Sequence, residues 1–430
     1  MDPVEIGTRR PRADAAEQVT GRLQFAGDMS LPGMLHARPF LSSEHHARIL
    51  SIDTRAAEAV PGVRTVVTGR DVPNNVTGQV IQDVPVLPLD KVRYRGEMVA
   101  LVVADTDEAA REAVGRMRVE YEPLPAVFDP RDAMKPGAPL VHEEGQGRFC
   151  DGNVVLIHGH DCFRLVHGDV EKGFAESDII IEHDFATGAQ KCAPIEPHVA
   201  LARPESSDRL TLWSCSQAPH MHGASLARIL GLPMNRVRMI TPAVGGGFGQ
   251  KNSMTIEPAV AVAALKTGRP VRLALTTSED FTYSHTRNPM YSSIKLGAKA
   301  DGTLMAIDRS HITNAGAYAS IAFIVSDKCA LIGSGPYRIP HQRAEARIVY
   351  TNKTTGGAMR GFGMAQPTFA MESIMDVLAA RLGMDPLELR MKNVLNDGDI
   401  NGTGQLMQGV GIGACLDMVS TMSGWRAKEG

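Results

Sequence analysis

Apolar and polar residues follow two different periods in the first third of the chain. The continuous apolar run from Met98 to Ala104 is typical of a buried strand. Asp107 to Met117 places alanines and charges at helical spacing, and Thr106 stands in the position of an N-cap. Arg118 to Tyr121 alternates like a half-buried strand. The pattern therefore predicts a strand, a helix and a second strand in succession.

Beyond this region the chain is predicted to mix strands and helices. Proline and glycine cluster between Pro123 and Gly147, where we place a domain boundary. Asp385-Pro386 supplies an N-cap followed by proline at N1, and starts the last clear helix. The other expected elements are strands over Arg209–Trp213 and Val237–Thr241 and helices over Ala218–Leu230, Ile256–Lys266 and Pro367–Leu382.

Composition narrows the class of protein. A chain of 430 residues is long enough for two or three domains with a sizeable core. Its net charge of -3, without a block of lysine and arginine, argues against a nucleic-acid partner. The six cysteines form no Cys-x-x-Cys pair, so the sequence encodes neither a zinc site nor a Cys-ligated iron–sulfur cluster.

The sequence shows no membrane span and no export signal. No stretch approaches the roughly 20 apolar residues that cross a bilayer. Arg9-Arg10 could be mistaken for a twin-arginine signal, but polar residues follow where an apolar region should stand. We therefore expect a cytoplasmic protein, not bound to a membrane, whose thiols stay reduced.

Two glycine–phenylalanine turns are the most distinctive segments: Gly245-Gly-Gly-Phe-Gly-Gln-Lys251 and Arg360-Gly-Phe-Gly363. Glycine has no Cβ, so such a loop lets a bulky ligand lie against backbone N–H groups. The first loop lacks the Gly-Lys-Ser/Thr ending of a phosphate loop and the third glycine of a dinucleotide fingerprint. Taken alone, it could also be a plain turn between a strand and a helix. The pair predicts two loops that converge on one cofactor.

Six motifs occur in a fixed order: Trp213-Ser-Cys-Ser-Gln217, the first loop, Asn314-Ala-Gly316, Gly335-Pro-Tyr337, the second loop with Gln366, and Leu382-Gly-Met-Asp-Pro386. Three more are Val19-Thr-Gly21, Phe25-Ala-Gly-Asp28 and His46-Ala-Arg48. Both sets resemble the molybdenum-binding subunit of the xanthine dehydrogenase and aldehyde oxidase family. The resemblance implies an α+β fold, with a small α/β hammerhead domain over residues 1–135 and the first half of a molybdopterin-binding domain over residues 136–430.

The chain stops where subunits of this family usually continue for several hundred residues. The missing part carries the second cofactor-binding half and the glutamate that acts as general base. Nicotinate dehydrogenases divide this subunit into a large and a medium chain, and the present chain resembles the large one. We therefore expect the second half, with its glutamate, on a separate medium chain.

The resemblance also implies a cofactor and its partners. The cofactor would be molybdenum held through molybdopterin, in its cytosine dinucleotide form, with no direct side-chain ligand to the metal. The reaction would be hydroxylation of an electron-poor carbon with oxygen taken from water. Two electrons would then pass to [2Fe–2S] clusters and FAD on partner chains, so the protein positions and polarises rather than supplying the redox centre.

Several residues match cofactor-contacting positions of the family. Gln217 matches a glutamine that hydrogen-bonds a molybdenum oxo ligand, which an amide can do without charge. Phe248 and Arg360 match residues whose backbone lies against the metal ligands. Plain polar or core positions are the alternatives for these side chains. The expected cofactor-binding residues are Gln217, Gly246, Gly247, Phe248, Gly249, Met359 and Arg360, with Gln217 also catalytic.

Three positions bear on the substrate. Phe362 matches an aromatic residue that stacks on a flat substrate ring, a contact worth roughly 0.5–1.5 kcal/mol. Asn252 stands where purine-oxidising members carry glutamate, which disfavours a purine. Lys328 stands where the family often has a substrate-facing arginine, and lysine keeps the charge without the bidentate fork. An ordinary solvated lysine is the alternative.

The sequence therefore predicts a molybdenum hydroxylase that acts on a small aromatic N-heterocycle, with nicotinate as the single best candidate. Within the family, the alternatives are a xanthine or purine, aldehyde or CO oxidiser and an enzyme of the hydroxybenzoyl-CoA reductase type. Outside it, the alternative is a catalytically silent assembly partner that keeps the fold.

Overall fold

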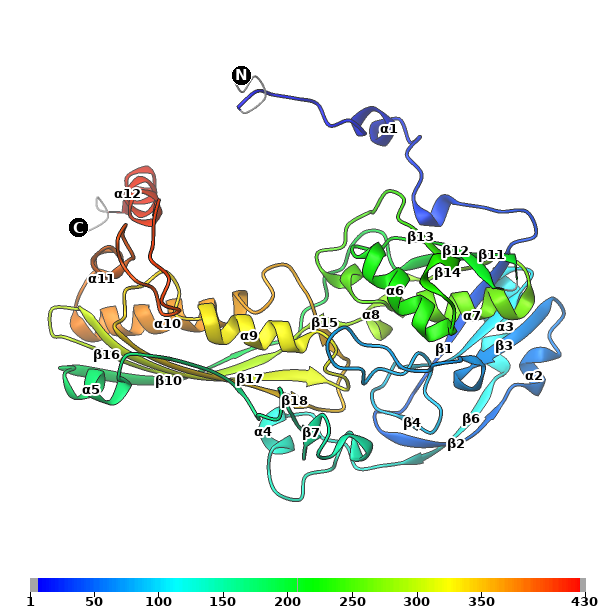
Figure 1. The fold of residues 1–430 in the computed structure, drawn as a ribbon, viewed down its shortest axis with the longest axis horizontal. Helices are drawn as coiled ribbons and strands as arrows, with labels where there is room; N and C mark the ends of the chain where they lie inside the picture. Colours follow the sequence, from blue (N-terminus) through cyan, green and yellow to red (C-terminus); the bar gives the residue numbers. More distant parts are fainter. Residues whose placement is uncertain (1–6, 207, 426–430) are drawn as a thin grey trace.

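The computed structural model describes residues 7–206 and 208–425, which form two units side by side, each built on a seven-stranded sheet (Figure 1). The unit on the right of Figure 1 contains the N-terminal strands, and the unit on the left contains the C-terminal helices. None of the described helices is long and apolar enough to cross a membrane.

The first sheet has the order β13-β12-β11-β14-β1-β5-β3. Strands from before and after the expected boundary pair within it, since β1 runs parallel to β14. The boundary near residue 135 therefore separates segments that share one sheet, and it stays a prediction. The strands are β1 (Leu35–Leu41), β3 (Val63–Thr68), β5 (Met98–Ala104), β11 (Val199–Ser206), β12 (Arg209–Ser214), β13 (Val237–Ile240) and β14 (Val271–Ala274).

Helices cover both faces of this sheet, which explains the continuous apolar run predicted for β5. All seven residues of β5 are buried. Leu101 and Val103 belong to the core cluster that also contains residues of α6 (Pro219–Leu230) and α7 (Glu257–Thr267). Ala100 and Val102 point the other way, into a cluster with α2 (Arg55–Glu58) and α3 (Asp107–Arg116). A strand covered on both faces reads as a continuous apolar run.

The second sheet has the order β10-β16-β17-β18-β8-β7, with β9 also paired to β18. Two helices, α9 (Ala322–Ile332) and α10 (Ala365–Leu382), lie on its upper face in Figure 1. Its strands are β7 (Cys150–Asp151), β8 (Val154–Val155), β9 (Phe163–His167), β10 (Ile179–Thr187), β16 (Met290–Ala298), β17 (Leu304–Gly316) and β18 (His341–Tyr350).

Smaller elements complete the fold. A three-stranded sheet joins β4 (Lys91–Val92), β2 (Ala47–Asp53) and β6 (Arg118–Pro123), and β15 (Thr286–Arg287) pairs with β19 (Gly356–Gly357). The other helices are α1 (Ala15–Val19), α4 (Pro130–Ala133), α5 (Val170–Ala175), α8 (Thr277–Tyr283), α11 (Pro386–Asn393) and α12 (Ile412–Ser423), with 3-10 turns η1 (Ala26–Asp28), η2 (Gly69–Asp71), η3 (Glu143–Gly145), η4 (Met234–Arg236) and η5 (Gln250–Asn252).

The element predictions are confirmed with two corrections. Thr106 caps α3 by accepting from the backbone N–H of Ala109, and Asp385 caps α11 in the same way. The helix at Asp385 is not the last one, because α12 follows it with most of its residues exposed. The predicted strand after α3 exists as β6, but it pairs with β2 rather than with β5.

Candidate functional site

The first glycine loop leaves β13 and turns sharply before η5. Gly246, Phe248 and Gly249 all have positive φ, at 94°, 52° and 101°. Phe248 is a bulky residue in a region that such residues avoid, and its side chain is 48% exposed. Strain of this kind persists only where surrounding contacts fix the backbone, and it gathers at functional sites.

Close contacts within the protein explain the glycines better than space for a ligand does. A Cβ on Gly245 would lie 2.5 Å from Cβ of Glu196, and one on Gly247 would lie 2.5 Å from Oε1 of Gln217. A Cβ on Gly249 would lie 2.8 Å from the carbonyl oxygen of Ala358. Each distance is too short for a real contact, so the loop requires glycine whether or not a ligand is bound.

The two glycine loops meet, as the sequence predicts. The backbone N–H of Arg360 donates to the carbonyl of Phe248 at 2.7 Å. The buried guanidinium of Arg287 donates from Nη2 to the Arg360 carbonyl at 2.8 Å. Met359 lies at the same junction, with its Cα 3.1 Å from the position of a Cβ on Gly249. Both backbone groups of Arg360 are thus used inside the protein, and its expected contact with a cofactor stays a prediction.

A run of free backbone donors remains in the first loop. No acceptor in the described part of the chain takes a hydrogen bond from the N–H groups of Gly246, Gly247 or Phe248. Consecutive N–H groups with alternating signs of φ form a concave anion-binding nest. This feature fits an anionic, oxygen- or sulfur-rich group such as the ligands of a pterin-bound metal.

Gln217 lies just beyond the end of β12, beside this nest. Its side-chain Oε1 accepts from the N–H of Gly249 at 2.9 Å. Its backbone N–H donates to the carbonyl of Lys251 at 2.9 Å. The Nε2 group has no acceptor among the described residues, and the residue is exposed. The side chain therefore supports the loop with its oxygen and leaves a neutral donor free.

Beneath the loop lies a buried polar network. His198 and Gln250 both contact Oδ1 of Asp280, at 2.8 Å and 3.3 Å, and Lys191 donates to the carbonyl of Ser284. Burial lowers the pKa of Lys191 from its ordinary value to about 8, although Asp280 opposes the change. The pKa of Asp280 lies below its ordinary value. Burial acts to raise it, but the hydrogen bond and charge of His198 lower it by more.

Unpaired buried polar atoms are concentrated near the two loops. Six of the twelve such atoms in the described part of the chain belong to residues of or beside these loops: Glu196 Oε1, His198 Nε2, Gln250 Oε1, Arg287 Nη1, Asn288 Oδ1 and Gln366 Oε1. Buried polar atoms are normally satisfied, so such a group indicates a site completed by water, a ligand or another chain. Among the described residues, no group of three or more His, Cys, Asp and Glu could hold a metal ion.

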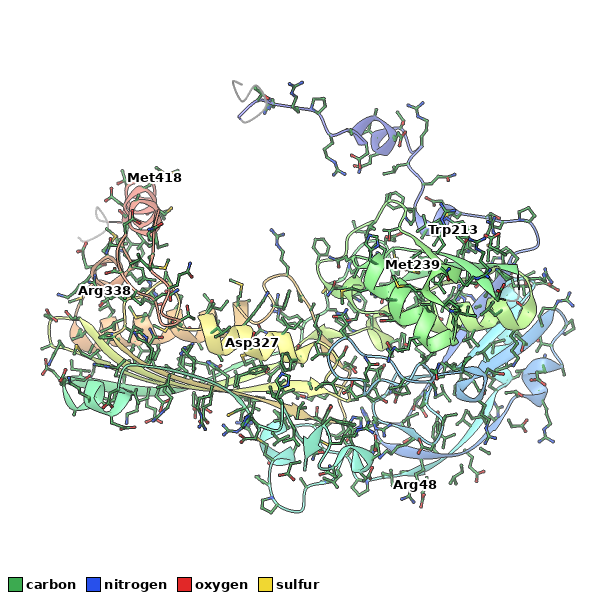
Figure 2. The ribbon with its side chains drawn as sticks, in the orientation of Figure 1. Arg48, Trp213, Met239, Asp327, Arg338 and Met418 are labelled. Atoms are coloured by element: carbon green, nitrogen blue, oxygen red, sulfur yellow. The ribbon has the colours of Figure 1, made fainter. Side chains whose placement is uncertain are left out.

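Two of the predicted substrate residues are in contact. The ammonium of Lys328, on α9, lies 4.0 Å from the centre of the Phe362 ring. Phe362 packs against Met290, Val325 and Cys329. Figure 2 labels Asp327, the residue next to Lys328 on α9, above the second sheet. The structure thus places a cation beside a partly exposed aromatic ring.

Asn252 has other recorded partners than the Lys328–Phe362 pair. Its carbonyl accepts from Nε2 of Gln79 at 2.5 Å and contacts Nε2 of His222 at 3.0 Å. The segment that follows Asn252 lines a cavity of about 560 Å³, together with Gln79, His222 and His285. Sequence reasoning missed these three residues, because nothing in the sequence links a glutamine at position 79 to a loop at position 252.

Two family models match the chain. The molybdopterin cofactor-binding domain matches residues 155–394, and the a/b hammerhead domain of aldehyde oxidase and xanthine dehydrogenase matches residues 20–125. The first match covers more than half of the chain. The chain belongs to the xanthine dehydrogenase and aldehyde oxidase family of molybdenum hydroxylases.

Individual relatives agree with this assignment. The chain is 39% identical to a probable xanthine dehydrogenase subunit from Bacillus subtilis (strain 168), over 91% of its own length and 51% of that protein. It is 35% identical to the nicotinate dehydrogenase large molybdopterin subunit of Eubacterium barkeri, over 94% of its length and 92% of that subunit. The chain thus spans about half of the first relative and nearly all of the second.

The fold is that of a solved family member. The aldehyde oxidoreductase from Desulfovibrio gigas superposes with a TM-score of 0.89 and 34% identity, over 97% of this chain and 46% of that one. The predicted fold class, a hammerhead domain followed by a molybdopterin-binding region, is confirmed.

Proposed function

We propose that this chain is the first half of a molybdenum hydroxylase catalytic subunit that oxidises a small aromatic N-heterocycle, with nicotinate as the best candidate. The oxygen added to the ring comes from water. The observation that carries the substrate class is the Lys328–Phe362 pair, whose groups lie 4.0 Å apart. The ammonium would pair with a substrate carboxylate, and the ring would pack against a flat heterocycle. The name of the Eubacterium relative supports the same class.

The cofactor fits the first loop on structural grounds. Gly246, Gly247 and Phe248 would bind the anionic ligand set through their free N–H groups, with Gly249 turning the chain beside them. Gln217 would donate from Nε2 to an oxygen of the metal centre. Met359 and Arg360 would hold Phe248 in place through the second loop. When bound, the molybdenum centre supplies the two-electron redox chemistry, which no side chain of this chain could supply.

Other chains would complete the enzyme. The second cofactor-binding half and its general-base glutamate would lie on a medium molybdopterin chain. A [2Fe–2S] subunit and an FAD subunit would carry the electrons away, in a cytoplasmic assembly whose pterin is in the cytosine dinucleotide form. Two relatives are named as subunits of larger enzymes, which supports an assembly of this kind.

The second candidate substrate is a purine. The identity of 39% to a probable xanthine dehydrogenase subunit favours it. Asn252 disfavours it, because an amide offers the ring neither the charge nor the proton acceptor strength of a carboxylate. Aldehyde or CO oxidation, and hydroxybenzoyl-CoA reduction, would use the same loops. A silent assembly partner would contain no molybdenum.

The test is Lys328→Met, measured on an aromatic acid and on its uncharged amide. Only the acid loses a charge partner, worth roughly 1.5–3 kcal/mol, so its kcat/KM should fall about 10-fold or more relative to the amide. Lys295→Met is the matched control. Lys295, on β16, makes the same kind of contact, with its ammonium 4.6 Å from the centre of the Phe174 ring. Equal losses for acid and amide would remove the basis for an anionic substrate.

A further inference from the structure

One carboxylate joins the two ends of the first glycine loop. Glu196 Oε2 accepts from the backbone N–H of Gly245 at 2.7 Å and from Nζ of Lys251 at 2.7 Å. The N–H of Glu196 also donates to the carbonyl of Gly245 at 3.2 Å. Gly245 and Lys251 are the first and last residues of the loop, so the carboxylate closes it into a ring.

Burial makes this closure strong. The Lys251 side chain is only 1% exposed and that of Glu196 is 11% exposed. A buried charge that loses its partner is costly, so the buried Lys251 ammonium depends on the Glu196 carboxylate beside it. The backbone of Gly245 can approach Glu196 this closely only because it has no Cβ.

The free donors and the strained residues lie between the two ends. Gly246, Gly247 and Phe248 follow the first end directly, and Gly249 comes two residues before the second. Glu196 comes three residues before β11, while Gln217 follows β12 and also binds the loop. These contacts tie the loop to two paired strands, which restricts the motion of the three N–H groups.

We propose that Glu196 is a positioning residue, which fixes the orientation of the Gly246–Phe248 donors by closing the loop through Lys251. What those donors bind rests on the proposed function, whereas the closure itself does not. Removing the carboxylate should loosen the loop locally, without unfolding the sheet that carries it.

Glu196→Gln tests this by hydrogen exchange on the full chain, co-expressed with the proposed medium chain. Glutamine keeps an acceptor for Gly245 but leaves Lys251 unpaired, so amides of residues 245–252 should exchange about 10-fold faster or more, with β11 and β12 unchanged. Asp107→Asn is the matched control, since it also turns a carboxylate that pairs with a buried arginine, Arg38, into an amide. It should leave the loop unchanged. Unchanged loop exchange in Glu196→Gln, or equal acceleration throughout the sheet, would overturn the proposal.

The double variant Glu196→Gln with Lys251→Met separates closure from charge burial. It removes both charges, so any loss in the free energy of unfolding caused by the unpaired lysine should be recovered. The loop amides should still exchange fast, because the link between the loop ends is gone. Slow exchange in the double variant would overturn the proposal, since burial of an unpaired charge alone would then explain the single variant.

Two measurements on the purified assembly connect the closure to the cofactor. Glu196→Gln should lower the molybdenum content per chain, and in the loaded fraction it should lower kcat with KM for the substrate unchanged. Full molybdenum content with unchanged kcat would contradict a positioning role. Absence of molybdenum from the wild type would count against the proposed function alone, because the exchange experiment would still decide on the closure.

Discussion

At the scale of single residues, Gln217 presents its two ends to different partners. Its oxygen accepts from the N–H of Gly249, and its Nε2 group is the proposed donor to the cofactor. Gln217→Ala should therefore lower kcat more than it raises KM, by about 10- to 1000-fold for one lost polar stabiliser. Steady-state kinetics on fully metallated protein measures this.

A second variant separates the two ends. Gln217→Glu keeps an acceptor for Gly249 and loses the donor, so it should lower kcat about as far as Gln217→Ala does. If Gln217→Glu retained wild-type kcat, the side chain would act only by supporting the loop, and it would be removed from direct contact with the metal centre.

Lys191 gives the site a pH dependence. Its pKa of about 8 lies below its ordinary 10.5, so between these values the folded state binds fewer protons than the unfolded state. Stability should therefore rise with pH across this window, by on the order of 3 kcal/mol in total. Lys191→Met should lose this rise. Unfolding midpoints in urea at pH 7.5 and 10 test it, and identical pH dependence in variant and wild type would contradict it.

At the scale of elements, the second loop depends on a close fit against α9. A Cβ on Gly363 would collide with the carbonyl oxygen of Val325, whereas one on Gly361 would have its nearest neighbour at 3.9 Å. Both glycines have positive φ, at 73° and 72°, so alanine strains the backbone equally at the two positions.

Gly363→Ala should therefore be more destabilising than Gly361→Ala, by about 1–3 kcal/mol of overpacking. It should also separate Phe362 from Lys328 and lower kcat/KM, while Gly361→Ala keeps most of the activity. Melting temperatures and kinetics of the two variants decide this. Equal effects would mean that the fit against α9 is unimportant.

The sequence predicts elements well where local chemistry decides them. The apolar run of β5, the cap at Thr106 and the Asp385-Pro386 start of α11 are all found in the structure. Pairing partners were not predictable, because the choice of β2 by β6 depends on contacts far apart in the sequence. The sequence analysis does not predict α12, although Ile412 and Leu416 of this helix pack against the core of the second unit.

The prediction of the candidate site rests on resemblance more than on physics. Gly-Phe motifs indicated two converging loops, and the hydrogen bond from Arg360 to Phe248 joins them. The roles of Glu196 and Gln79 could not be predicted, because each acts through a contact with a loop that is distant in the sequence. The sequence analysis explains the glycines by space for a ligand, whereas in the structure neighbouring side chains and backbone exclude a Cβ.

At the scale of the whole molecule, large apolar side chains are exposed on α9, α10 and the loops beside them. They are Phe248, Leu331, Ile332, Met364 and Phe369, each between 38% and 50% exposed. Exposed apolar side chains of this size are typical of an interface or of a tendency to aggregate. Contact with the proposed second cofactor-binding half would cover these side chains.

Expression of this chain alone should therefore yield aggregated or cofactor-free protein, and co-expression with the medium chain should rescue it. Size-exclusion chromatography with metal analysis measures both outcomes. A monodisperse, molybdenum-loaded and active isolated chain would contradict the division of the site between two chains.

The origin of the added oxygen tests the proposed hydroxylase activity most directly. The purified assembly is given nicotinate in water enriched in ¹⁸O, and the product is weighed by mass spectrometry alongside the molybdenum content of the assembly. We expect one ¹⁸O atom in each product molecule, with product formed in proportion to bound molybdenum. Product oxygen that comes from O₂, or turnover without molybdenum, would contradict the proposed function.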